Sequence, residues 1–133
     1  MIAGLHNRIL EFGHQYRGIK EYVYHEQFDT PQYHDNDIAL ITVNTPFDFS
    51  DPNVQPIEMF KLDEGAPPEG TICNSTGWGV KKPGAYTYPN ALQLVQIPIH
   101  SKETCETMYP GYITYGMTCA GGPGTGPCNV RKN

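Results

Sequence analysis

The sequence has no apolar run long enough to cross a membrane as a helix and no cluster of basic residues. A spanning helix needs about 20 consecutive apolar residues, and binding to nucleic acid or a lipid surface needs a basic stripe or patch. Charged residues make up only 17% of the chain, and the formal charge of −5 is spread along it. We therefore expect neither a nucleic-acid partner nor a membrane partner.

The sequence also lacks the closely spaced cysteine pairs of a zinc site. Its four cysteines are Cys73, Cys105, Cys119 and Cys128, and zinc ligands come in shorter paired gaps. We expect no metal ion and no cofactor. An even count suits two disulfides and an oxidising compartment, although two of these residues can have partners outside the chain. The first eight residues lack the charged-then-apolar order of a signal peptide.

The composition favours loop-rich β structure over helix. The chain holds 14 Gly, 12 Pro and 9 Tyr; Gly and Pro interrupt regular elements, and Tyr suits strands. Apolar patterning predicts strands over residues 19–25, 38–43 (buried on both faces), 71–79, 91–99 and 115–120. Ser101 is expected to cap a short helix that ends near Tyr109. A connection over residues 44–70, with five prolines, is the predicted boundary between two packed units.

Three stretches carry a resemblance to a known family: NDIALI at 36–41, GTICNSTGWG at 70–79, and CETMYPGYITYGMTCAG at 105–121. In this order and spacing they resemble the trypsin/chymotrypsin-like serine proteases. The resemblance implies an all-β fold of two antiparallel barrels, both incomplete here. Residues 1–62 would supply the later part of the first barrel and a linker, and residues 63–133 the first part of the second. It also implies a secreted endopeptidase that forms an acyl-enzyme, acts on proteins or peptides, and is a monomer when complete.

The resemblance assigns roles to four residues. Asp37 matches the catalytic aspartate that orients the histidine; without the resemblance it reads as a turn cap before a strand. His34 matches a substrate-pocket residue, or else it is a solvated loop histidine. Tyr109 matches a residue that borders the primary pocket and can equally serve in packing. Gly126 falls where trypsins place the aspartate at the base of that pocket, so we expect a preference for apolar side chains rather than Arg or Lys.

Two catalytic groups have no match in the sequence. The family's Ala-His-Cys stretch is not found, and Lys132 stands where the nucleophilic serine of Gly-Asp-Ser-Gly-Gly is expected. We therefore expect the chain as given to be inactive, with residues 130–133 representing translated intron. The alternative is a non-catalytic homologue that binds protein partners.

The resemblance also implies a disulfide between Cys105 and Cys119. Cys73 and Cys128 would then find partners downstream, with a Cys73–Cys128 bridge as the alternative. Separately, Asn74-Ser75-Thr76 fits the pattern of an N-glycosylation acceptor. Because it lies in a predicted strand beside Trp78 that we expect to be packed, the sequence predicts that Asn74 stays unmodified.

Overall fold

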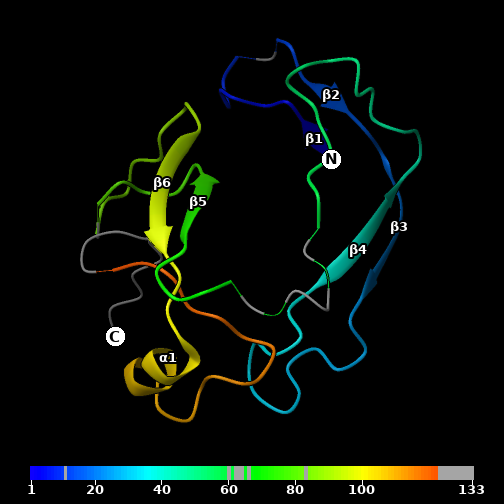
Figure 1. The fold of residues 1–133 in the computed structure, drawn as a ribbon. Helices are drawn as coiled ribbons and strands as arrows, with labels where there is room; N and C mark the ends of the chain where they lie inside the picture. The colour runs from blue at the N-terminus through cyan, green and yellow to red at the C-terminus, as the bar shows by residue number, and fades with distance from the viewer. Residues whose placement is uncertain (11, 60, 62–64, 66, 83, 123–133) are drawn as a thin grey trace.

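The computed structural model describes residues 1–10, 12–59, 61, 65, 67–82 and 84–122. The elements along the chain, shown in Figure 1, are β1 (Ile2–Ala3), β2 (Gln15–Tyr16), β3 (Ile19–Tyr24), β4 (Ala39–Val43), β5 (Ile72–Gly77), β6 (Gln93–Pro98) and α1 (Lys102–Met108).

The strands form three separate antiparallel pairs: β1 with β2, β3 with β4, and β5 with β6. None of these sheets closes into a barrel within the ranges that the structure describes. In Figure 1, β1 to β4 lie together on one side and β5, β6 and α1 on the other. The predicted all-β fold with incomplete barrels is confirmed, together with the short helix.

The β3–β4 pair forms as predicted but is not buried. It runs from the pair Ile19–Val43 to the pair Tyr24–Ala39, and aromatic and β-branched residues suit both strands. Leu40 is nevertheless 73% exposed. The prediction that residues 38–43 are buried on both faces is wrong for this structure. Burial of a sheet needs a second layer, and the described residues place none over this pair.

The described chain buries four apolar residues, one in the first half and three in the second. Val54 lies against β1's end, with its Cγ2 3.0 Å from the position that a Cβ on Gly4 would occupy. Ile97, Ile99 and Cys105 are buried in the second half, at 7%, 8% and 1% exposure. The beginnings of a core therefore lie in the second half, and the first half contributes one buried apolar side chain.

The two halves are joined by backbone hydrogen bonds near the N-terminus. The Arg8 amide donates to the Asn90 carbonyl at 2.9 Å, and the Leu92 amide donates to the His6 carbonyl at 2.7 Å. The His6 carbonyl also accepts from Trp78 Nε1 at 3.3 Å. These bonds hold the first residues of the chain against the segment that enters β6.

β2 is anchored to the connection that follows β4. Gln15 Nε2 donates to the Asp48 carbonyl, and Gln15 Oε1 accepts from the Asp48 amide, both at 2.8 Å. Arg17 Nε donates to the Pro46 carbonyl at 2.7 Å. Hydrogen bonds from Ser50, with a smaller contribution from the Arg17 charge, hold the pKa of the Asp48 carboxyl below its ordinary value.

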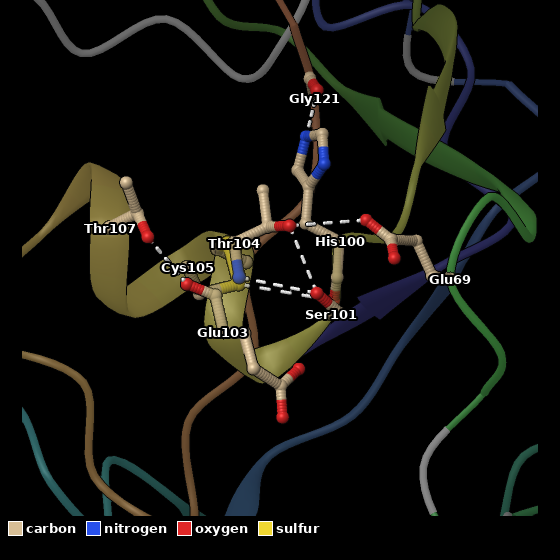
Figure 2. Close-up of a disulfide and its surroundings, with 9 residues drawn as sticks. Glu69, His100, Ser101, Glu103, Thr104, Cys105, Thr107 and Gly121 are labelled. Atoms are coloured by element: carbon tan, nitrogen blue, oxygen red, sulfur yellow. Dashed lines mark hydrogen bonds between the residues drawn. A yellow bond between two sulfur atoms is a disulfide. The ribbon is translucent and has the colours of Figure 1, made fainter.

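Helix α1 has the N-cap and the disulfide that the sequence leads us to expect. Ser101 is its N-cap, with Oγ accepting from the Thr104 amide at 3.2 Å, which satisfies one of the free first-turn amides. Cys105 in α1 is bonded to Cys119, so the predicted disulfide is present. Figure 2 shows this disulfide, with His100 Nε2 2.6 Å from the Gly121 carbonyl oxygen beside it.

The predicted strand over residues 115–120 is wrong. Met117 donates its amide to the Thr114 carbonyl in a turn, and Tyr115 is 95% exposed. Only Ala120 makes a bridge, to Ile99. The His100 amide donates to the Cys119 carbonyl and the Gly121 amide donates to the Pro98 carbonyl, so pairing is confined to this single bridge. Among the described residues, no helix has the length and apolar character needed to cross a membrane.

Candidate active site

Asp37 lies between a compact loop and the start of β4. The loop leaves β3 at His25, whose amide donates to the Ile38 carbonyl at 3.1 Å, so its two ends meet. Asp37 stands at this closure, exposed to solvent. Within the described residues its carboxylate makes no hydrogen bond or ion pair, so both oxygens are available to a donor from elsewhere.

Asp29 closes the loop from inside. Its Oδ1 accepts from the His34 amide at 2.7 Å, and its own amide donates to the Asp35 carbonyl at 2.9 Å. Asp29 thus accepts one hydrogen bond and donates another across the loop. The bond from the His34 amide is the stronger type, because its acceptor is a carboxylate.

Asn36 holds the loop from the other side. Its Nδ2 donates to the carbonyls of Gln27 at 3.1 Å and Thr30 at 2.8 Å. Its backbone amide is also held, because it donates a hydrogen bond to Asp35 Oδ1 at 3.0 Å. The residue directly before Asp37 is thus fixed through both its backbone and its side chain.

Three non-glycine residues of this loop adopt a left-handed conformation: Asp29 (φ 60°), His34 (φ 67°) and Asn36 (φ 53°). Asp, Asn and His are the non-glycine types that enter this region most readily. The residue types of the loop therefore favour its conformation. This conformation fixes the position of the backbone at Asp37.

The structure places His34 on the same loop as Asp37. Its side chain is exposed, and its ring centroid lies 3.9 Å from that of Tyr33. The roles of both residues remain predictions, because no contact in the described chain tests them.

The loop also touches the second half of the chain. Gln32 Nε2 donates to the Gly111 carbonyl at 3.5 Å. Asp35, 6% exposed, has its Oδ1 3.5 Å from where a Cβ on Gly116 would stand. Figure 1 shows the β3–β4 loop beside the segment that follows α1.

Tyr109 is the C-cap of α1, two residues before this contact. Its amide donates to the Cys105 carbonyl at 2.9 Å, and its side chain is 52% exposed. The loop from His25 to Ile38, called the Asp37 loop below, thus contacts the segment that follows Tyr109. Gly126 and Cys128 lie outside the described residues.

The sequence does not by itself predict the hydrogen bonds that Asp29, Asp35 and Asn36 make inside this loop. Asn36 is noted above only as part of the stretch 36–41. The available signal was the concentration of Asp, Asn and Pro between Asp29 and Asp37, since these residues favour side-chain-closed turns. No group of three His, Cys, Asp or Glu suitable for a metal occurs in the part of the chain that the structure describes.

Known proteins resemble this chain along almost its whole length. A family model described as Trypsin matches residues 1–129. Rat kallikrein-8 is 38% identical over 91 residues, 68% of this chain and 34% of its own length. Trypsin zeta of Drosophila melanogaster is 37% identical, covering 81% of this chain and 39% of itself. Pig trypsin is 32% identical, with coverage of 89% and 49%.

A solved structure shares the fold. It is that of neuropsin, a serine protease expressed in the limbic system of mouse brain, with a TM-score of 0.78 and 30% identity. The match covers 90% of this chain and 52% of that one. The chain thus spans at most about half the length of these relatives.

Proposed function

The chain belongs to the trypsin family, and we propose that it is part of a secreted serine endopeptidase that cleaves peptide bonds through an acyl-enzyme. The observation that carries the proposal is the Asp37 loop. It holds a solvent-accessible carboxylate at the start of β4, next to Asn36, which is fixed by its own hydrogen bonds. The acyl-enzyme route uses an aspartate carboxylate that accepts a hydrogen bond from the catalytic histidine, and both oxygens of Asp37 are free to do so within the described residues.

In this mechanism Asp37 acts on a histidine rather than on the substrate. Its carboxylate accepts a hydrogen bond from the imidazole, which fixes the tautomer and stabilises the imidazolium formed when the histidine takes the proton of the serine hydroxyl. The histidine and the serine are supplied by parts of the protein outside this chain. The chain covers 34–49% of the relatives' lengths, which leaves room for both. We infer that these 133 residues alone do not hydrolyse peptides.

Substrate contacts would come from the junction between the two halves. His34 borders the site of the side chain before the scissile residue, and Tyr109 borders the primary pocket. With Gly126 at the base of that pocket, no acid is present to attract Arg or Lys, so apolar side chains are preferred. The two incomplete barrels are assigned to residues 1–62 and 63–133. The complete protein is a monomer, and the Cys105–Cys119 disulfide supports an extracellular location.

The proposal is tested on the protein encoded by the full mature transcript and on the 133-residue chain, side by side. The whole protein should react with a fluorophosphonate probe at one serine and cleave peptides after apolar residues. The chain alone should do neither. In the whole protein, Asp37→Asn should lower kcat by about 10⁴-fold, the loss known for this change in proteases with the Ser-His-Asp arrangement.

Glu26→Gln is the matched control, because Glu26 is an exposed acid of the same loop, and its kcat should be unchanged. A whole protein that cleaves peptides equally well with Asn at position 37 would overturn the role of Asp37. A whole protein that does not react with the probe, and contains no serine in the expected Gly-Asp-Ser-Gly-Gly context, would establish the non-catalytic homologue instead.

A further inference from the structure

β5 carries an acceptor pattern that the protease function does not use. Asn74-Ser75-Thr76 occupies the middle of the strand, and the middle residue of the pattern is not proline. The structure differs here from the expectation of a packed strand, because Asn74 and Thr76 are both exposed, whereas Ser75 is only partly so. The reason for predicting an unmodified Asn74 is therefore wrong.

The exposure follows from which face of the β5–β6 pair these residues occupy. Side chains alternate between faces along a strand. Cys73 is paired with the buried Ile97 on the inner face. Asn74 is paired with Gln96 on the outer face, where both are exposed. An antiparallel pair with one packed and one solvated face shows this alternation.

The side chain of Asn74 is lightly held. Its Oδ1 accepts one hydrogen bond, from Gln96 Nε2 at 3.3 Å. In the described part of the chain, its Nδ2 donates none. A sugar attached to Nδ2 would therefore displace no hydrogen bond that this nitrogen makes within the described residues. Thr76, the other residue that defines the pattern, lies on the same exposed face.

We propose that Asn74 is N-glycosylated. The co-reactant is an oligosaccharide linked to a polyisoprenyl diphosphate, the donor found on the secretory route. Asn74 Nδ2 forms a bond to C1 of the first sugar, the bond between C1 and the phosphate oxygen breaks, and polyisoprenyl diphosphate leaves. One amide proton passes to a base of the transferase, so no oxidant or reductant is involved.

A glycan at this position would stand over exposed apolar side chains. Ile72 and Leu94 are 58% and 63% exposed, and they belong to the same outer face as Asn74 by the pairing register. An attached oligosaccharide is bulky and solubilising, so it would cover this face without disturbing the inner one.

The inference rests on the secretory location in the proposed function but not on proteolytic activity. It is tested by expressing the chain in eukaryotic cells behind a supplied secretory leader. A tag at the C-terminal end carries a second, well-used acceptor pattern, which reports that each molecule has met the transferase. The readouts are the mobility shift removed by peptide N-glycosidase and the mass of the peptide containing Asn74.

The unmodified sequence should carry one more glycan than Asn74→Gln or Thr76→Ala, both of which should carry only the tag glycan. Ser75→Ala is the matched control and should keep both glycans, because the middle position accepts any residue except proline. Two variants that abolish the pattern differently guard against misfolding of either one. A glycosylated tag together with an unmodified Asn74 peptide would overturn the inference, whatever the activity of the whole protein.

Discussion

The backbone amide of His34 donates a 2.7 Å hydrogen bond to Oδ1 of Asp29 across the loop that ends at Asp37. Asp29 and His34 both have left-handed backbone conformations. The bond therefore links two of the three left-handed positions of the loop. It makes Asp29 a positioning residue for the candidate catalytic carboxylate.

Asp29→Ala should loosen this loop. The change removes the acceptor for His34 and places alanine in a conformation that L residues enter with difficulty. Amide hydrogen exchange at His34 should become faster by about tenfold, which corresponds to about 1.4 kcal/mol of local opening and lies near the low end for hydrogen bonds to charged groups.

Asp29→Asn is the control for this prediction. Asparagine tolerates the same backbone conformation and keeps a side-chain oxygen, so His34 should exchange nearly as slowly as in the unmodified chain. Equal exchange rates in the alanine and asparagine variants would show that Asp29 does not hold the loop.

Asp48 should titrate below its ordinary value. Its pKa is lowered chiefly by the hydrogen bonds from Ser50, then by the Arg17 charge. Because the folded-state pKa lies below the unfolded one, the associated stability is present above the unfolded pKa and disappears as the pH falls through the folded pKa. NMR titration of the carboxyl carbon should show the low midpoint, and Ser50→Ala should raise it. An unchanged midpoint in that variant would exclude the Ser50 hydroxyl as the main cause.

The Cys105–Cys119 bond should matter more for stability than Cys73. The bond joins residues 14 positions apart, and closing a loop of this size contributes about 3 kcal/mol on a chain-entropy estimate. Replacing both cysteines by alanine should lower the urea midpoint of the dilute chain substantially. Cys73→Ala, at a free and partly buried thiol, should lower it far less; a similar loss in both would contradict the assignment.

The 133-residue chain should self-associate when it is produced alone. β3 and β4 expose Val23 at 54% and Leu40 at 73%, and their outer backbone edges are open to further strands. Sedimentation velocity should show oligomers whose fraction falls with Leu40→Lys. Thr87→Lys adds the same charge on an exposed loop residue and should leave association unchanged. A monomeric unmodified chain would show that this surface does not drive association.

Local patterns were sufficient to predict most of the elements. The β-branched and aromatic residues of β3 and the Ser101 cap of α1 act through neighbours in sequence, so both appear as predicted. Tyr115 has strand-like residues around it but finds no partner strand, and Leu40 has an apolar setting but no covering layer. Pairing and burial depend on residues distant in sequence, which periodicity does not reveal.

The candidate site divides in the same way. Asp37 and His34 were identified through their resemblance to family motifs, whereas the bonds from Asp29 and Asn36 that shape the loop were not. Those bonds depend on left-handed backbone angles at three positions. Asp, Asn and His permit such angles without requiring them, so the sequence alone does not determine which residues adopt them.

The hydrogen bonds between the N-terminal segment and the entry to β6 also have a consequence in time. Arg8 and Tyr88, which belong to this junction, are 80 positions apart. At about 5–20 residues per second, a ribosome needs roughly 4–16 seconds to make the stretch between them. During that interval the segment around His6 and Arg8 lacks the residues to which it is hydrogen-bonded in the folded chain. The junction is a contact of high sequence separation, so we expect it to form late in folding.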